Sequence, residues 1–155
     1  HLVGALNNGW AVANTTLAHE RGTAFPFKEQ VVHEVYLDEL WQLAATSDRL
    51  DDVEIADALA QSFVELRILR LHNWRTLSRL ARGIEPGPES SITKLAWTEM
   101  TQALSARALA VVGASAPLQG SWAKQWLWSQ AASIAGGTSE IQKNIVGDRI
   151  LGLPR

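Results

Sequence analysis

Apolar residues recur every three or four positions along most of the chain, and no stretch alternates apolar and polar residues as a strand would. This spacing predicts helices over residues 8–21, 28–45, 53–82, 90–112, 122–134 and 139–150. Short connections between long helices favour antiparallel neighbours. The sequence therefore predicts an all-α fold, an antiparallel (up-down) four-helix bundle with an extra short C-terminal helix.

The apolar positions also predict how the helices pack. The helix over 53–82 has a wide apolar face, so we expect it to be central, with Ile55, Leu59, Phe63, Leu66, Leu69, Leu77 and Leu80. The apolar positions of the helix over 28–45 are Val31, Val35, Leu37, Leu40 and Leu43. In the helix over 90–112, small residues at helical spacing should let another helix approach closely, namely Ala96, Ala103, Ala106 and Ala110.

Local signals mark the ends of these helices. Gly22 and Pro26 should weaken or kink the first helix. Residues 46–48 form a predicted loop, and either Asp51 or Asp52 is a suitable N-cap for the helix that follows. Two prolines exclude helix from residues 83–88, and 113–120 is a further predicted loop.

Length and composition limit the kinds of function. The chain has 155 residues, enough for one domain, and a formal net charge of −2, which gives no electrostatic basis for binding nucleic acid. It has no cysteine, so disulfide and thiolate chemistry are excluded. No apolar run is long enough to span a membrane. The four histidines lack the spacing of metal ligands, so no metal site is predicted.

A glycine turn near the C-terminus is the clearest candidate site. It reads Gly136-Gly137-Thr138-Ser139-Glu140-Ile141-Gln142. Ser139 can cap the helix that follows, with Gln142 reaching back as in a capping box. A helix N-terminus presents free N–H groups and a positive dipole, which suits an anion. The alternative is a plain helix stop and restart with no ligand.

A carboxylate near the end of the first helix is the second candidate. On a helical wheel Glu20 lies about 40° from the centre of an apolar stripe. Burial would raise the pKa of such a carboxyl and make it a better base toward a carbon acid. The alternative is an exposed side chain paired with Arg21 or Lys28.

Two motifs together resemble a known family. The G-G-T-S-E-I-Q turn followed by I-L-G-L-P-R at the chain end, together with residues 9–21, resembles the C-terminal helical domain of acyl-CoA dehydrogenases. The resemblance covers essentially the whole chain, although only helix spacing matches between residues 40 and 125. It implies FAD as cofactor and α,β-dehydrogenation of an acyl-CoA thioester.

The resemblance also implies roles for particular residues. Family members carry their catalytic carboxylate either just before the G-T-S turn or, in isovaleryl and long-chain types, on the first helix before an arginine. Gly136 has no side chain at the first position, and Glu20 precedes Arg21 at the second, so Glu20 is implied as the base. Arg21, Gly136 and Gly137 are then expected to contact substrate, with the Gly136 N–H donating to the thioester carbonyl. The FAD contacts are expected from Thr138, Ser139 and Glu140.

Other positions depart from the family pattern. The flavin-binding stretch of the family has an arginine followed by Phe-Gly, and the corresponding residues 44–52 contain Arg49 but no Phe-Gly. Residues 113–116 only faintly match a second feature of the family, a flavin-binding glycine loop. These departures leave a non-catalytic assembly subunit of a heteromeric enzyme as the alternative. Trp122, Trp126 and Trp128 are interpreted as packing residues, with a wall of the acyl pocket as the alternative.

The resemblance carries expectations for the rest of the protein. We expect residues 1–155 to be a single domain of a longer chain, with 1–7 the tail of a preceding β-domain, and the isolated piece to be inactive. Expected partners are acyl-CoA, electron-transferring flavoprotein as acceptor, and other subunits in a homo- or hetero-oligomeric dimer or tetramer. A cytoplasmic, bacterial-type location is favoured, with a mitochondrial one left open.

Overall fold

The computed structural model describes residues 1–22, 24–115 and 120–154, with side chains at 18–26 and 115 outside the described set. Over these ranges the secondary structure is helical, without strands. The elements are α1 (Gly9–Gly22), α2 (Ala24–Thr46), η1 (Arg49–Asp51), α3 (Val53–Leu80), α4 (Ser90–Val112), η2 (Gly113–Ser115), α5 (Ser121–Ser129), η3 (Gln130–Ser133) and α6 (Ser139–Arg149).

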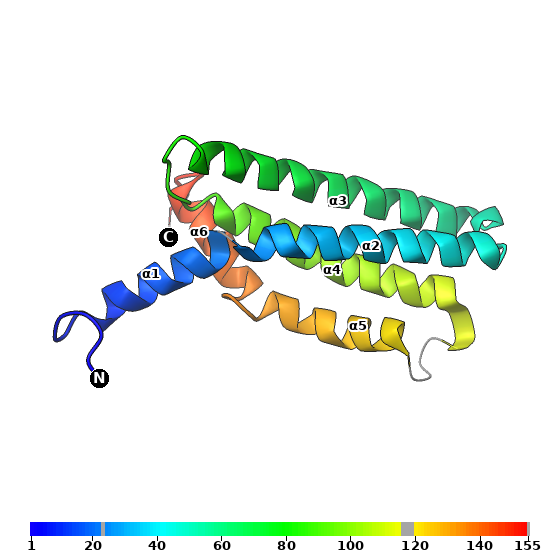
Figure 1. Cartoon of the computed structure of the whole chain (residues 1–155), viewed down its shortest axis with the longest axis horizontal. Coiled ribbons are helices and arrows are strands. Elements are labelled where there is room, and N and C mark those ends of the chain that lie inside the picture. The colour runs from blue at the N-terminus through cyan, green and yellow to red at the C-terminus, as the bar shows by residue number, and fades with distance from the viewer. Residues whose placement is uncertain (23, 116–119, 155) are drawn as a thin grey trace.

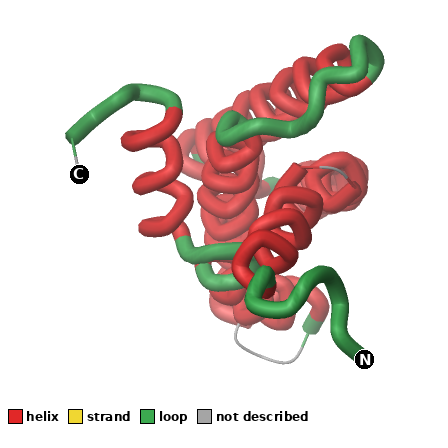
Figure 2. The backbone as a smooth tube through the Cα atoms, turned by 90° about the vertical axis from the view of Figure 1, so that its left-hand side faces the viewer, coloured by secondary structure: helices red, strands yellow, loops and turns green. Residues whose placement is uncertain are grey.

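Four helices run up and down beside one another, as predicted. In Figure 1, α2, α3, α4 and α5 alternate in direction along the long axis, while α1 projects from one end and α6 lies across that same end. Figure 2 shows α6 on one side of the bundle and the N-terminal segment on the other. The predicted fold class, an all-α up-down bundle with an extra C-terminal helix, is confirmed.

The central helix is α4, not α3 as expected. α4 packs against α2, α3, α5 and α6, whereas α3 has its main contacts with α2 and α4 only. Ile55, Leu59, Leu66 and Leu69 of α3 are buried as predicted, but Phe63 and Leu77 are each 48% exposed. Because α3 has packed neighbours on one side only, its apolar face is wider than the core it contacts.

The close packing along α4 uses small polar residues more than the predicted alanines. Ala106 and Ala110 are exposed, while Thr98, Thr101, Ser105 and Ala108 are buried. The Ser105 hydroxyl donates to the Thr101 carbonyl at 2.7 Å. Such back-bonding satisfies the hydroxyl within its own helix, so serine and threonine act here as small core residues.

The buried face of α2 differs from the predicted one at its first two positions. Val31 and Val35 are exposed, and the buried residues are His33, Leu37, Leu40 and Ala44. His33 is held in the core by two neighbours. Its Nδ1 lies 2.7 Å from the Glu29 carbonyl oxygen and its Nε2 3.0 Å from Thr101 Oγ1. A carbonyl only accepts, so Nδ1 carries the proton and the threonine hydroxyl donates to Nε2.

The helix ends largely follow the predicted signals. Asp52 caps α3, because its side chain accepts from the Glu54 N–H at 3.0 Å. α2 begins at Ala24, earlier than predicted, because Pro26 lies in the first turn, where proline is tolerated. The helix predicted over 122–134 is present as α5 and then the tighter turn η3.

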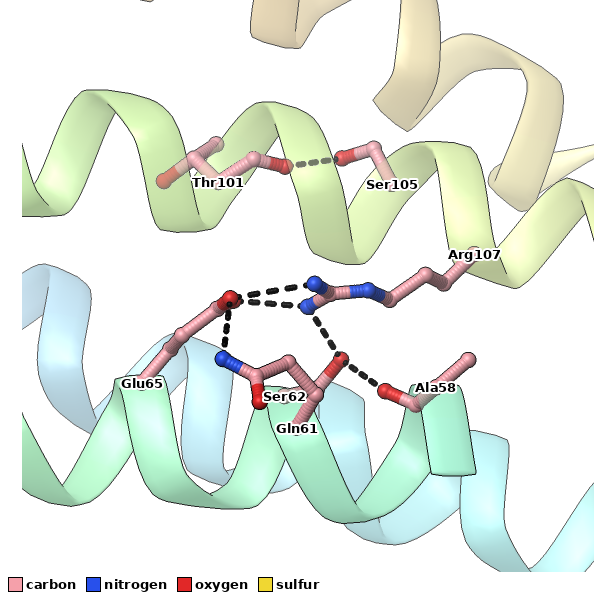
Figure 3. A network of polar contacts seen from close by, with 7 residues as sticks. All are labelled: Ala58, Gln61, Ser62, Glu65, Thr101, Ser105 and Arg107. Carbon is pink, nitrogen blue, oxygen red and sulfur yellow. Dashed lines mark hydrogen bonds and ion pairs between the residues drawn. The ribbon is translucent and has the colours of Figure 1, made fainter. Parts of the chain in front are cut away.

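An ion pair joins the middle of α3 to α4. Arg107 donates to both carboxylate oxygens of Glu65, at 2.6 and 3.0 Å, and to the Ser62 hydroxyl at 2.9 Å (Figure 3). Burial acts to raise the pKa of Glu65, but hydrogen bonds from Arg107 and Gln61 outweigh it, so this pKa lies below the usual value. The pair fixes the register of α3 on α4, because two parallel N–H···O bonds specify both distance and orientation.

Candidate functional site

The glycine turn lies between η3 and α6, and both of its glycines have a positive φ. Gly136 has φ 66° and Gly137 φ 98°, in the left-handed region that glycine adopts without strain. A Cβ at Gly136 would meet no atom within 4 Å, so open space lies beside this residue. A Cβ at Gly137 would lie 2.6 Å from Gln142 Nε2. The turn is therefore open at its first glycine and closely packed at its second.

The cap of α6 is Thr138, not Ser139 as predicted. Thr138 Oγ1 accepts from the Ile141 N–H at 3.3 Å, and Ser139 is the first residue of the helix. Gln142 does reach back, but not in a capping box. Its Nε2 donates to the carbonyls of Gly136 and Gly137, at 3.1 and 3.2 Å. The reason is the turn itself, which directs both glycine carbonyls toward this buried side chain.

Side chains of α4 hold the segment that leads into the turn. The buried Lys94 ammonium donates to the Ala132 carbonyl at 2.5 Å, and the Thr98 hydroxyl donates to the same oxygen at 3.2 Å. Gln102 donates to the Ser129 carbonyl at 3.3 Å. Burial lowers the pKa of Lys94. Sequence reasoning missed this group. The available signal was the spacing, because Lys94 lies one helical turn before Trp97 and Thr98 and therefore on the same face of α4, which is buried.

Polar groups cluster at the start of α6. Glu140 is exposed, and the pKa of its carboxyl is lowered by a hydrogen bond from its own backbone N–H and by one from the Thr138 side chain. The dipole of α6 acts in the same direction. Together with Ser139, these groups offer hydroxyls, a carboxylate and N–H donors. The hydroxyls and N–H groups at this helix N-terminus can donate to an anion, whereas the Glu140 carboxylate can only accept.

The predicted base, Glu20, lies on α1, a different helix from the one that follows the glycine turn. The backbone of Glu20 and Arg21 is in the last turn or two of α1, and their side chains lie outside the described residues. Both α1 and α6 contact α4. In Figure 1 the C-terminal end of α1 and the whole of α6 lie at the same end of the bundle. The fold thus brings the two elements that carry the predicted site residues to one end of α4, while the role of Glu20 stays a prediction.

Other candidate residues have structural contacts. Trp122 packs on the core with its ring 4.6 Å from that of Tyr36, which confirms the packing interpretation, whereas Trp128 is 73% exposed. Arg49 donates to the Ala110 carbonyl at 3.1 Å and so ties η1 to α4. Among the residues described, no three His, Cys, Asp or Glu side chains gather as metal ligands would. No helix in the described ranges is long and apolar enough to cross a membrane.

Comparison with known proteins covers almost all of the chain. A family model described as "Acyl-CoA dehydrogenase, C-terminal domain" matches residues 7–151. Acyl-CoA dehydrogenase IpdE1 of Mycobacterium tuberculosis is 33% identical over 159 residues, which cover 99% of this chain and 40% of that protein. Acyl-CoA dehydrogenase FadE34 of the same organism is 34% identical over 163 residues, covering 99% of this chain and 21% of that protein.

A solved structure has the same fold. The protein named "Tcur3481-Tcur3483 steroid ACAD" superposes with a TM-score of 0.84 at 22% identity, over 99% of this chain and 42% of that one. This chain therefore spans less than half of the length of the relatives it matches, between 21% and 42%. The family match includes both the glycine turn and α1. The chain belongs to the acyl-CoA dehydrogenase family and corresponds to its C-terminal helical domain.

Proposed function

We propose that this chain is the C-terminal domain of an FAD-dependent acyl-CoA dehydrogenase that introduces an α,β double bond into an acyl-CoA thioester. The observation that carries the proposal is the family match over residues 7–151, which includes a turn with no side chain at Gly136 and a first helix that carries Glu20. The open space beside Gly136 supports the proposal, because a carboxylate from another helix needs room at that point.

In the proposed mechanism Glu20 removes the proton from the carbon next to the thioester carbonyl. Bound FAD supplies the hydride acceptor. The negative charge that develops on the carbonyl oxygen needs a fixed donor, and we assign the backbone N–H of Gly136 to it. Among the described residues no hydrogen bond uses this N–H. One such donor is typically worth about 3–4 kcal/mol in the transition state.

The residues next to Glu20 and Gly136 are assigned the remaining contacts with substrate and FAD. Arg21 and Gly137 are proposed to contact the substrate. Thr138, Ser139 and Glu140 are proposed to hold the adenosine and phosphate part of FAD. Gln142 and Lys94 act indirectly, because they hold the backbone that presents these groups.

Substitution of the base tests the mechanism in the full-length protein. Glu20→Gln should reduce flavin bleaching in a single turnover with substrate about 100-fold or more, with FAD absorbance retained. Glu20→Asp should retain part of the rate, and Glu39→Gln, an exposed site on α2, is the matched control. Placing a carboxylate at the other position, Glu20→Gln with Gly136→Glu, should restore part of the rate. Unchanged bleaching in Glu20→Gln would refute the role of Glu20.

The substrate class is taken from the solved neighbour. Because that protein is named a steroid enzyme, we propose that the substrate is a thioester with a bulky ring-containing acyl group. The proposed acceptor is electron-transferring flavoprotein, and the proposed location is a bacterial cytoplasm, as the resemblance to the family implies. Anaerobic bleaching with a steroid-derived acyl-CoA should be faster than with a straight-chain acyl-CoA of similar length. A preference for the straight chain would refute this substrate class without affecting the mechanism.

The second candidate is a non-catalytic assembly subunit of such an enzyme. It is favoured by residues 44–52, which lack the Phe-Gly of the flavin-binding stretch and whose Arg49 bonds to Ala110. Under this alternative the Glu20→Gln variant keeps full activity in a complex that still binds FAD.

A further inference from the structure

A buried lysine of α4 bonds to the segment that leads into the glycine turn. Lys94 is 7% exposed, and among the residues described its ammonium has no carboxylate partner. The centre of the Trp97 ring lies 5.9 Å from its Nζ, which is a weak substitute for a counter-ion. Lysine is rarely buried without a paired charge, because the ammonium loses its hydration. Its presence here points to a role that an apolar side chain could not fill.

Two donors of α4 converge on one backbone oxygen. The Lys94 ammonium lies 2.5 Å and the Thr98 hydroxyl 3.2 Å from the carbonyl oxygen of Ala132. The two donors are four residues apart on α4 and so project from the same face of the helix. A carbonyl oxygen has two lone pairs, so these two bonds use its full accepting capacity.

The same oxygen is the acceptor that the Gly136 N–H would use at a typical helix end. The helical pattern continues as far as Ala135, whose N–H donates to the Ala131 carbonyl at 2.9 Å. The next bond in that series would run from Gly136 to Ala132, and a left-handed glycine after a helix commonly forms it. Gly136 has the left-handed φ of 66°, yet within the described part of the chain its N–H forms no backbone hydrogen bond.

We propose that Lys94 and Thr98 are positioning residues that keep the Gly136 N–H available to a substrate oxygen. By occupying the Ala132 carbonyl, they remove the acceptor within the chain that this N–H would otherwise use. The N–H then reaches the thioester carbonyl without first breaking a hydrogen bond. This inference rests on the role proposed above for the Gly136 N–H, although the competition for the Ala132 oxygen can be measured without any catalysis.

The charge of Lys94 explains why the side chains win that competition. A hydrogen bond from a charged donor is roughly twice as strong as one between neutral groups, so the ammonium holds the Ala132 oxygen against a backbone N–H. The neutral Thr98 hydroxyl takes the second lone pair. An apolar side chain at position 94 would leave one lone pair open to Gly136.

Hydrogen exchange at the Gly136 amide tests the competition in the full-length, FAD-bound protein without substrate, read at single-residue resolution by mass spectrometry. Lys94→Met with Thr98→Val removes both donors with little change in volume. The Gly136 amide should then bond to Ala132 and exchange at least about ten-fold more slowly than in the unsubstituted protein. Ser105→Ala, which removes another buried hydroxyl of α4, should leave the exchange unchanged.

A further variant separates this role from simple support of the segment. Gln102 donates to the Ser129 carbonyl in the same segment, at 3.3 Å, but does not touch the Ala132 oxygen. Gln102→Leu should therefore loosen the segment without slowing exchange at Gly136. If the double variant fails to fold, Lys94→Met and Thr98→Val alone serve for the same measurement, because each frees one lone pair.

Single-turnover flavin bleaching with an acyl-CoA tests the consequence for the reaction. The double variant should bleach about ten-fold or more slowly at saturating substrate, because the N–H must first leave Ala132, while the half-saturating concentration changes less than about two-fold. Lys94→Met alone, which keeps the Thr98 hydroxyl, should show a smaller loss. Ser105→Ala should keep the full rate.

The outcomes distinguish this inference from the proposed function. It is overturned if the Gly136 amide of the double variant exchanges as fast as that of the unsubstituted protein, or if the amide becomes protected while bleaching keeps its full rate. If the unsubstituted protein bleaches with no acyl-CoA, the proposed function fails. Slower exchange in the double variant would still show that Lys94 and Thr98 hold this amide free.

Discussion

His33 shows how one buried side chain joins two helices and responds to pH. It is 2% exposed, donates to the Glu29 carbonyl from its own helix and accepts from Thr101 on α4. Burial lowers its pKa, because the charged ring would lose hydration, although the Glu29 carbonyl and carboxylate partly oppose this. The neutral ring is thus the form that the fold selects.

This shift predicts a loss of stability in mild acid. The unfolded chain binds a proton at His33 near pH 6.5, whereas the folded chain binds it only at lower pH. Between these two values the unfolded state carries more protons, so the free energy of unfolding falls as the pH drops below about 6.5. Urea titrations at several pH values should show this slope, and His33→Gln should flatten it. An unchanged slope would mean that other groups, such as His72, cause it.

At the scale of elements, the glycine turn and its cap make the strongest predictions. The two glycines differ in what surrounds them, although both have positive φ. Gly136→Ala should lower the free energy of unfolding by about 1 kcal/mol, the conformational term alone. Gly137→Ala should lower it by about 2 kcal/mol or more, because Gln142 must move and give up its bonds to two carbonyls. Equal losses in denaturant titrations would contradict the packed environment of Gly137.

A second pair of alanine substitutions tests which residue caps α6. Thr138→Ala removes the acceptor for the Ile141 N–H and should reduce stability by about 1 kcal/mol. Ser139→Ala removes a hydroxyl that does not cap the helix and should change stability by less than about 0.5 kcal/mol. The reverse order, measured by thermal or urea unfolding, would restore Ser139 as the cap.

Local signals determined how much of these elements could be predicted. Glycine, proline and Asp52 act within a few residues, so most helix ends and the position of the turn were predicted closely. The exception is α2, which begins at Ala24 because Pro26 is tolerated in its first turn. Thr138 and Ser139 are neighbours with similar capping ability, so sequence alone did not decide between them. The bond from Lys94 to Ala132 joins residues 38 positions apart and has no local signal.

For the whole molecule, the position of α4 predicts how stability is distributed. Because α4 contacts all five other α-helices, its amides should open only in global unfolding. Hydrogen exchange should therefore be slowest near Leu104 on α4 and faster along α3, whose outer face is exposed. If amides of α3 exchanged more slowly than those of α4, the central position of α4 would be wrong.

The sequence did not reveal that α4 is the central helix, because α3 has more large apolar residues and therefore looked more central. α3 carries more large apolar residues than its core face uses, and the excess, such as Phe63 and Trp74, lies on the surface. α4 builds much of its buried face from residues such as Thr98, Thr101 and Ser105, which resemble surface positions in sequence. The Glu20 prediction depends on the resemblance to the family, because periodicity alone left an exposed side chain as the alternative, and it stays a prediction.

The bonds from α4 to Ala132 also determine when the site can form. A segment held by side chains 34 and 38 residues earlier in the chain gains nothing until those helices have docked. The glycine turn should consequently be among the last parts to order during folding and among the first lost on warming. A heated sample would then pass through a stage that retains most of its helix but no longer presents its two glycines to a ligand.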